Sequence, residues 1–438
     1  MQDVRSDPPP RPRASDVLPR RFGRYLLFDR IGQGGMAEIF LARAATELGS
    51  ARLVVVKQIL PELAGDPAFA RMLIAEAKLA AQLRNGNVVQ VYDLGREDER
   101  LFIAMEYVEG FDLHALLRQL SKTKTPLPAE FAIFVVREVL AALSYAHRAK
   151  ADDGSPLGLV HRDVSPSNVL VSFEGEVKLC DFGIARALAV TTADGAGQGA
   201  GAPDGDDDDD ERPKGSGIAG KAAYMSPEHA RGEAIDARAD VFAAGILLWE
   251  LCAGRRMYRG TDLVMLTLAR SAAVPALPDR GLPEFALLES VLAKALAPAV
   301  EDRFATAMDF QKALDDYASK VHLMASPLRF GTFLTEHFGA ELVAKRRSRE
   351  RGAQALELGP PAILEPIGAL PVRASEPPLR ESVPMPLTKR IAAAPTAAPS
   401  SAQLTTSRKR VSALIWALVL GGLGAAVFIA AWLGGWLE

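Results

Sequence analysis

Two short polar motifs near the middle of the chain constrain its fold more than any other feature of the sequence. The run His161–Asn168 reads His-Arg-Asp-Val-Ser-Pro-Ser-Asn, and Asp181–Gly183 follows it as Asp-Phe-Gly. Asp163 is a carboxylate that can accept a proton, whereas Asn168 and Asp181 carry oxygens of the kind that bind a hard divalent cation. Each aspartate alone could be a turn residue. The ordered pair of motifs predicts two loops that meet in one cleft.

A glycine-rich turn and a single lysine precede these motifs. Gly32–Gly35 lies between two predicted strands, and glycines let a backbone approach phosphate groups and offer N–H donors to them. Lys57 ends the apolar run Val54–Val56 and needs a negative partner, which Glu76 could supply from the following helix. Alone these features would be a tight hairpin and a surface ion pair. Ahead of the two motifs they predict phosphoryl transfer, in which Lys57 orients phosphates and Asp163 accepts a hydroxyl proton.

The apolar pattern changes from strand-like to helical along the chain. Short apolar runs between glycine or polar turns predict strands at 25–31, 39–42 and 53–59. Apolar residues at helical spacing predict helices at 67–83, 131–148 and 241–252. This order predicts an α+β fold with a small strand-rich lobe, a larger helical lobe and a cleft between them.

With these motifs in this order, residues 24–320 resemble the protein kinase fold, and in particular the eukaryotic-like serine/threonine kinases of bacteria. The resemblance implies ATP and Mg²⁺ (or Mn²⁺) as cofactors. It assigns catalysis to Asp163, Lys57 and Glu76, and metal binding to Asn168 and Asp181. The residues that would contact the nucleotide are Ile31, Gly32, Gln33, Gly34, Gly35, Met36, Ala37, Glu38, Ile39, Val55, Lys57, Glu106, Val108 and Leu170.

Further segments match the family pattern outside the nucleotide site. Met105–Val108 resembles the hinge whose backbone pairs with adenine, above a floor formed by Leu170. Ser226–Glu228 resembles the end of the activation segment, and Asp240–Gly245 one of the structural helices behind it. The family pattern also implies that Arg303 pairs with the glutamate Glu228 and that this pair is architectural.

Four departures from the family pattern concern the site, the first of which is Val55 in place of the alanine of the nucleotide strand. Ala37 replaces the third glycine of the phosphate loop, and Ser165 replaces a lysine that follows the catalytic aspartate. Lys221 stands where the family has a threonine. We expect Lys221 to supply the missing positive charge to the γ-phosphate, the alternative being a lysine that points to solvent. The changes at 165 and 221 also bear on the choice of acceptor hydroxyl.

The activation segment carries an acidic run and few phosphate acceptors. The run Asp204–Glu211 predicts a solvated insertion, and the alternative is an acidic strand that docks on basic residues of the site. Autophosphorylation would add a phosphate that Arg162 could hold. The candidate acceptors are Thr191, Thr192 and Ser216.

The two ends of the chain differ from its middle in composition. Residues 1–23, rich in proline and arginine, predict a disordered arm. Residues 321–351 predict a C-terminal helical extension, and 352–410 a proline-rich linker with a basic end. The run 411–437 contains no charge and directly follows Arg408-Lys409-Arg410. It predicts a single transmembrane helix in the cell (inner) membrane, with the kinase domain on the cytoplasmic side.

The expected partners are protein substrates and the membrane, in a role in signal transduction. A homodimer would serve autophosphorylation, and the net charge of −3 gives no argument for nucleic acid. Two alternatives stand beside the enzyme: a pseudokinase, and a membrane scaffold that recruits partners through the kinase fold and the proline-rich tail. The complete set of catalytic and metal-binding residues favours the enzyme.

Overall fold

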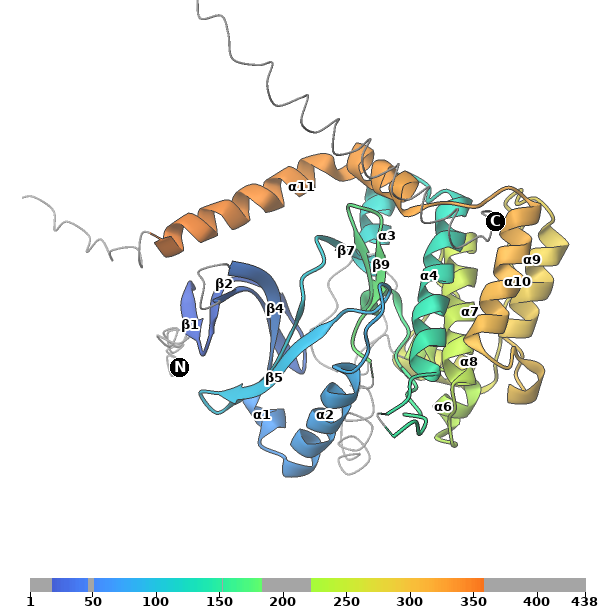
Figure 1. Ribbon diagram of the computed structural model, residues 1–438. Coiled ribbons are helices and arrows are strands. Elements are labelled where there is room, and N and C mark those ends of the chain that lie inside the picture. The colour runs from blue at the N-terminus through green and yellow to red at the C-terminus, as the bar shows by residue number, and fades with distance from the viewer. Residues whose placement is uncertain (1–17, 46–50, 152, 183–221, 358–438) are drawn as a thin grey trace, which may run out of the picture. The chain divides into compact units, whose positions relative to one another are not determined.

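The computed structural model describes residues 18–45, 51–151, 153–182 and 222–357 of the 438-residue chain (Figure 1). In this part the chain forms a strand-rich lobe, then a helical lobe, and then one long helix. The two-lobed α+β fold predicted from the sequence is therefore confirmed.

The strand-rich lobe is built on a six-stranded antiparallel sheet in the order β1-β2-β3-β4-β6-β5. The strands are β1 (Arg20–Phe22), β2 (Tyr25–Gln33), β3 (Ala37–Ala45), β4 (Ala51–Ile59), β5 (Val91–Glu97) and β6 (Arg100–Glu106). Two helices, α1 (Pro61–Ala64) and α2 (Pro67–Ala80), follow β4, and α2 contacts β5. The predicted strands and the predicted helix at 67–83 all exist, with ends that differ by a few residues.

The alternation of side chains along β4 places the lysine of the site. Val54 and Val56 belong to the apolar cluster on one face of the sheet, whereas Val55 packs on the other face with Leu73 of α2. Since successive side chains of a strand point to opposite faces, Lys57 shares the face of Val55. The sequence pattern of β4 thus directs a cation toward α2 and the cleft.

The predicted disordered arm 1–23 is wrong at its end. Arg20–Phe22 forms β1, which pairs with the start of β2. Phe22 is buried, and its ring makes an edge-to-face contact of 5.2 Å with Phe102. The burial of this aromatic residue stabilises the pairing of the short strand with the sheet.

The helical lobe surrounds α7, a helix whose residues from Ala239 to Ala253 are all buried. A helix that is buried on every side lies in the centre of a lobe. The helices of the lobe are α3 (Leu113–Lys122), α4 (Ala129–His147), α6 (Pro227–Arg231), α7 (Arg238–Ala253), α8 (Asp262–Arg270), α9 (Phe285–Ala295) and α10 (Ala307–Lys320). The predicted helices at 131–148 and 241–252 are α4 and α7. A small sheet of β7 (Gly110–Asp112), β8 (Val169–Ser172) and β9 (Val177–Leu179) faces the cleft.

The long helix α11 (Pro327–Glu357) follows the helical lobe, and its C-terminal part contacts β2 of the strand-rich lobe (Figure 1). The structure thus extends the predicted helical extension by several residues into the segment that was predicted to be a linker. The rest of the linker and the predicted span 411–437 lie outside the described residues. Among the helices that the structure describes, none combines the length and the apolar character needed to cross a membrane.

Candidate active site

The predicted nucleotide site coincides with a pocket between the two lobes, with a volume of about 550 Å³. Apolar side chains of the strand-rich lobe form one wall, and Leu170 of β8 lies on the other. Polar groups gather at the inner end, where Lys57 and Asp181 lie. The predicted nucleotide and metal residues that line the pocket are Ile31, Ile39, Val55, Lys57, Glu106, Val108, Leu170 and Asp181. An apolar slot with a few convergent polar groups is the usual form of a cofactor site.

The turn of the predicted phosphate loop, residues 32–38 between β2 and β3, is not part of the pocket lining, whereas Ile31 and Ile39 on either side of it are. The backbone N–H of Gly34 donates to the carbonyl of Ala37 at 2.9 Å, and Gln33–Gly35 is exposed. The carboxylate of Glu38, a predicted nucleotide contact, instead forms ion pairs with Arg30 at 3.2 Å and with Arg100. The Glu38 side chain is thus already paired on the sheet.

Lys57 and Asp181 form the central ion pair of the site. Lys57 Nζ lies 2.8 Å from Asp181 Oδ2, and the lysine is 8% exposed. Burial alone would lower the pKa of Lys57, but the charge of Asp181 and the hydrogen bond to it outweigh burial and raise this pKa above its ordinary value. Lys57 is therefore a permanent cation directed into the pocket.

Glu76 lies on α2, half-buried, one residue before Ala77 of the apolar face. Among the described residues, Lys57 forms its ion pair with Asp181, in place of the pair with Glu76 that the resemblance implied. The position of Glu76 on the helix is as expected, while the partner of Lys57 is different.

The loop 161–168 presents Asp163 and Asn168 side by side. Asn168 Nδ2 donates to the backbone carbonyl of Asp163 at 2.7 Å, and the N–H of Asp163 donates to His161 Nδ1 at 3.2 Å. Arg162 and Asp181 have φ values of +66° and +61°, in the left-handed region that side chains other than glycine rarely adopt. Backbone strain of this kind concentrates at functional sites, where the surrounding structure maintains it.

Asp240 at the start of α7 supports the loop 161–168 through its carboxylate. Its carboxylate accepts hydrogen bonds of 2.8 Å from the backbone N–H of His161 and from that of Arg162, and it also contacts His147 Nε2 at 2.8 Å. Burial would raise the pKa of Asp240, but the hydrogen bond to His147 and nearby positive charge lower this pKa below its ordinary value. The sequence had marked Asp240 only as part of a structural helix, so its role as support of the loop was missed.

The residues fit a metal bound together with a nucleotide. Asn168 uses its amide nitrogen on Asp163, which leaves the amide oxygen as a ligand, and Asp181 offers a carboxylate. In the part of the chain that the structure describes, no group of three or more histidine, cysteine, aspartate or glutamate side chains is placed to hold a metal by itself. Mg²⁺ typically binds one or two protein oxygens plus substrate phosphates, and this donor set matches that pattern.

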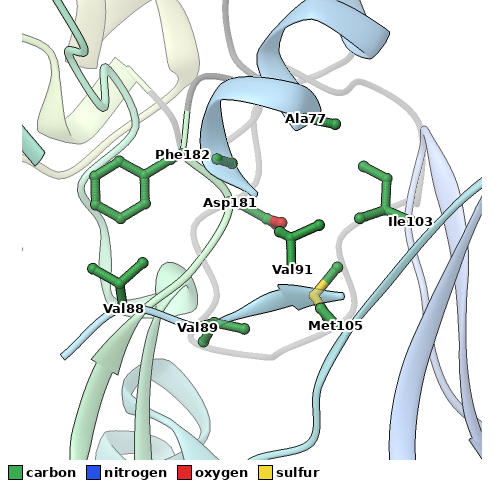
Figure 2. A pocket seen from close by; sticks show the side chains of 9 residues that line it. Ala77, Val88, Val89, Val91, Ile103, Met105, Asp181 and Phe182 are labelled. Atoms are coloured by element: carbon green, nitrogen blue, oxygen red, sulfur yellow. The ribbon is translucent and has the colours of Figure 1, made fainter. Parts of the chain in front are cut away.

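A small apolar cavity of about 20 Å³ lies next to Asp181 (Figure 2). Ala77 of α2, Ile103 and Met105 of β6, and Phe182 border it, and Asp181 reaches its edge. The ring of Phe182 also makes an edge-to-face contact with His161, at 4.6 Å between centroids. Asp181 thus lies between this apolar cavity and the open nucleotide pocket.

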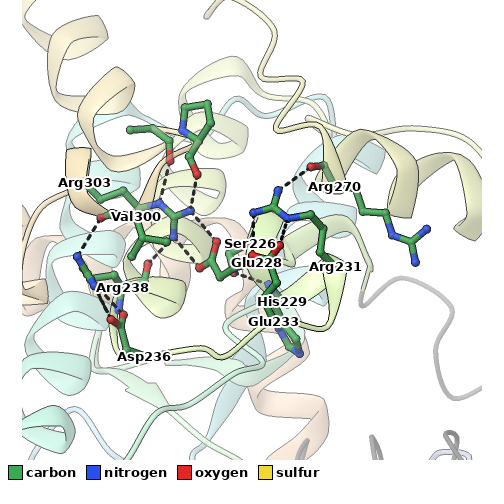
Figure 3. A network of polar contacts seen from close by, with 12 residues as sticks. Ser226, Glu228, His229, Arg231, Glu233, Asp236, Arg238, Arg270, Val300 and Arg303 are labelled. Carbon is green, nitrogen blue, oxygen red and sulfur yellow. Dashed lines mark hydrogen bonds and ion pairs between the residues drawn. The ribbon is translucent and has the colours of Figure 1, made fainter.

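Glu228 and Arg303 form the predicted architectural pair in the helical lobe (Figure 3). Two hydrogen bonds of 2.7 and 2.8 Å join the guanidinium to the carboxylate. Burial would raise the pKa of Glu228, but the hydrogen bonds from Arg303 lower this pKa below its ordinary value. The pair fixes the end of the activation segment, at α6, to the segment that precedes α10.

Two further residues of the site were missed by the sequence reasoning. Lys178 on β9 pairs with the hinge carboxylate Glu106 at 3.0 Å, and Asp112 lines the outer part of the pocket. For Asp112 a signal exists, because it stands a few residues after the hinge, directly before a helix, where an aspartate is a favoured cap, and it caps α3 by accepting from the N–H of Ala115. Of the predicted site residues, Lys221 lies outside the described residues, as do Thr191, Thr192 and Ser216.

A strand-rich lobe and a helical lobe that meet at a pocket with Lys57, Asp163 and Asp181 define a kinase-like class of fold. The chain belongs to the protein kinase family, since the family model for the protein kinase domain matches residues 25–284. The chain is 38% identical over 331 residues to the tyrosine-protein kinase MasK of Myxococcus xanthus, which covers 74% of this chain and 48% of MasK.

Other relatives agree on the family. The chain is 36% identical over 305 residues to the probable serine/threonine-protein kinase PknB of Bifidobacterium longum, which covers 67% of this chain and 40% of that protein. A crystal structure of the Mycobacterium tuberculosis PknI kinase domain, in a single-mutant form, matches with a TM-score of 0.50 at 28% identity, over 69% of this chain and 98% of that domain. The chain thus spans about half or less of the length of the two curated relatives.

Proposed function

We propose that this chain is a protein kinase that transfers the γ-phosphate of ATP to serine or threonine hydroxyls of protein substrates and of itself. The observation that supports it most is the Lys57–Asp181 ion pair at 2.8 Å, at the inner end of a pocket next to the Asp163–Asn168 loop. Kinase chemistry needs a cation for the phosphates, oxygen ligands for the metal and a carboxylate for the acceptor. The relative PknB of Bifidobacterium longum is described as a probable serine/threonine-protein kinase, which supports the acceptor class.

The residues divide the work as follows. Lys57 binds phosphate oxygens of ATP, and Asn168 and Asp181 hold the metal, which neutralises phosphate charge when it is bound. Asp163 orients the acceptor hydroxyl. The hydroxyl oxygen forms a bond to the γ-phosphorus while the bond from that phosphorus to the bridging oxygen breaks. ADP leaves with the electron pair, and the hydroxyl proton passes to Asp163.

The direct test is phosphorylation by the purified full chain with radiolabelled ATP and Mg²⁺. We expect phosphoserine and phosphothreonine in the acid hydrolysate of the product. An Asp163→Asn variant should lose about 10³-fold in turnover, in the range that a general base contributes, and should still bind nucleotide. Asp316→Asn on the exposed side of α10 is the matched control. Turnover by Asp163→Asn at the wild-type rate would contradict the assigned site, and nucleotide binding without turnover in the wild type would favour a pseudokinase.

A tyrosine acceptor is the second candidate. The relative MasK is described as a tyrosine-protein kinase, and Ser165 replaces the lysine that is usual in serine/threonine kinases. We further propose that Lys221 replaces that lysine at the γ-phosphate. Lys221→Thr should then cost about 10²-fold in turnover, and adding Ser165→Lys should restore much of it. Phosphotyrosine as the main product would favour the tyrosine acceptor. Turnover by Lys221→Thr at the wild-type rate would contradict the proposed role of Lys221.

For the location of the enzyme, we propose that residues 411–437 anchor it in the cell membrane with the kinase domain in the cytoplasm, where it takes part in signal transduction. The support is sequence alone. The run 411–437 carries no charge and follows Arg408-Lys409-Arg410, and positively charged residues beside a span favour the cytoplasmic side of the membrane. Extraction of membranes with alkaline carbonate should leave the full chain in the pellet, whereas a chain that ends at residue 407 should be released. Release of both forms would contradict the anchor.

A further inference from the structure

The first half of α11 is attached to the helical lobe by an apolar stripe. Phe330, Leu334, Phe338 and Leu342 recur at helical spacing and are buried. The ring of Phe330 stacks on Phe131 of α4 at 4.9 Å between centroids. Apolar residues at this spacing dock one face of a helix, and their burial fixes the helix to the lobe.

Two glycines show that this attachment is specified by the sequence. A Cβ on Gly331 of α11 would lie 2.8 Å from the backbone of Phe173, and a Cβ on Gly175 would overlap the carbonyl oxygen of Pro327. Glycine is needed at both positions because helix and turn meet backbone to backbone. The start of α11 therefore lies directly on the β8–β9 turn, next to the small sheet of the cleft.

The second half of α11 holds the hinge by charged contacts. Glu109, which follows the predicted hinge 105–108, accepts hydrogen bonds from Arg346, the shortest at 3.1 Å, and forms an ion pair with Arg349. Lys345 Nζ donates to the backbone carbonyl of Gly110 at 3.2 Å and lies 4.4 Å from the centroid of the Phe111 ring. The backbone carbonyl of Glu109 in turn accepts from the N–H of Phe173 in the turn below. The segment that directly follows the hinge is thus held between α11 and the β8–β9 turn.

The same half of α11 also borders the nucleotide pocket. Glu341, Lys345 and Arg349 line it together with Val108 and Leu170. Of the two arginines that pair with Glu109, Arg349 is 14% exposed in its side chain and Arg346 is 52% exposed, so the Arg349 contact is partly shielded from solvent. An element that follows the helical lobe in sequence therefore completes the outer end of a site formed by the two lobes.

We propose that residues 341–349 of α11 are a positioning element of the nucleotide site, which holds the segment 107–110 in its nucleotide-binding conformation through Glu109 and Gly110. The inference rests on the proposed function, because it concerns the affinity for the same adenine nucleotide. A hinge that is already fixed before binding loses less conformational entropy when adenine pairs with it. Releasing the contact should therefore weaken nucleotide binding and leave the transfer step almost unchanged.

The test is a charge-reversal series in the full chain, with the dissociation constant of Mg·ADP measured by calorimetry. Arg346→Glu with Arg349→Glu places acidic groups against Glu109 and should raise this constant about five- to tenfold, in line with one or two part-buried ionic contacts. The Michaelis constant for ATP should rise in parallel, with the turnover number within about twofold of wild type. Adding Glu109→Arg restores opposite charges and should recover most of the affinity. Arg347→Glu changes the charge of an exposed residue in the same turn and should have no effect.

The outcomes separate the inference from the function it rests on. Unchanged affinity in the Arg346→Glu, Arg349→Glu variant, with wild-type binding intact, overturns the inference alone. Tighter binding in that variant also overturns it, because α11 would then obstruct the pocket. Failure of Glu109→Arg to recover affinity, in chains whose thermal unfolding matches wild type, would mean that the charges act by another route and would overturn it as well. A wild-type chain that binds no Mg·ADP would overturn the proposed function together with the inference.

Discussion

The ion pair Glu228–Arg303 in the helical lobe and the ion pair Lys57–Asp181 in the cleft use the same chemistry in opposite ways. Arg303 makes two bonds to Glu228, and its remaining donors reach the backbone carbonyls of Ala297, Pro298 and Arg238. The side chains of Arg303 and Glu228 are 0% and 4% exposed. Every part of this pair is enclosed, as a permanent link requires.

The Lys57–Asp181 pair is open on one side. Lys57 makes an ionic contact of 2.8 Å with Asp181, whose side chain is 25% exposed, and both residues line the pocket. The difference teaches that an enclosed pair maintains the fold, whereas an open pair can exchange its partner for phosphate and metal. Breaking the first should cost stability, and breaking the second should cost activity.

The largest effect is expected for the open pair. Lys57→Met removes the cation that orients the phosphates and should lower kcat/KM for ATP by about 10³-fold, comparable with the loss of a preorganised electrostatic group. The midpoint of thermal unfolding should move little, because an apolar side chain suits this buried face of β4. Lys320→Met breaks an exposed pair with Glu284 and serves as the control in both assays. A variant with wild-type autophosphorylation would exclude Lys57 from the site.

Breaking the enclosed pair Glu228–Arg303 should lower the stability of the fold. Glu228→Gln leaves the buried guanidinium of Arg303 without its counter-charge and should lower the free energy of unfolding by about 3 kcal/mol, as for other broken buried pairs. Urea denaturation of the full chain measures this. Glu233→Gln, which breaks the exposed pair with Arg231, should change the free energy by about 0.5 kcal/mol or less. Equal effects of the two substitutions would mean that enclosure is not what distinguishes the pairs.

The stabilisation by the enclosed pair should also depend on pH, because it requires the charged form of Glu228. The folded-state pKa of Glu228 lies below its ordinary value, so its contribution to stability is present above the unfolded pKa of about 4.5 and is lost as pH falls through the folded pKa. The difference in unfolding free energy between wild type and Glu228→Gln should therefore be constant near neutral pH and shrink below about pH 4.5. A difference that grows on acidification would reverse the assigned sign.

The residues that the sequence located best are those fixed by short covalent spacing. Asp163 and Asn168 come together because one loop carries both, and β4 alternation alone directs Lys57 to the cleft. The family pattern also anticipated the Glu228–Arg303 pair, which the structure confirms at 2.7 Å. Such features depend on local geometry or on a motif of the family. Both can be recognised in a single sequence.

The features that the sequence did not reveal depend on contacts between distant segments. Whether Lys57 pairs with Asp181 or Glu76 is decided by tertiary distances, and no local pattern encodes them. The contact between Arg346 and Glu109 joins residues far apart in the chain, so the docking of α11 on the hinge left no signal beyond an amphipathic stretch. The strand β1 was missed for a similar reason, since the ring of Phe102 that anchors it is distant in sequence.

The most direct test of the account is the Mg²⁺ dependence of ATP binding in two variants, Asp181→Asn and Glu228→Gln. If Asp181 is the exchangeable partner of Lys57 and a ligand of the metal, Asp181→Asn should bind ATP with an affinity that no longer rises when Mg²⁺ is added. Glu228→Gln, measured where it remains folded, should keep the full Mg²⁺ effect. An Asp181→Asn chain whose affinity for ATP increases with Mg²⁺ as in the wild type would contradict the account.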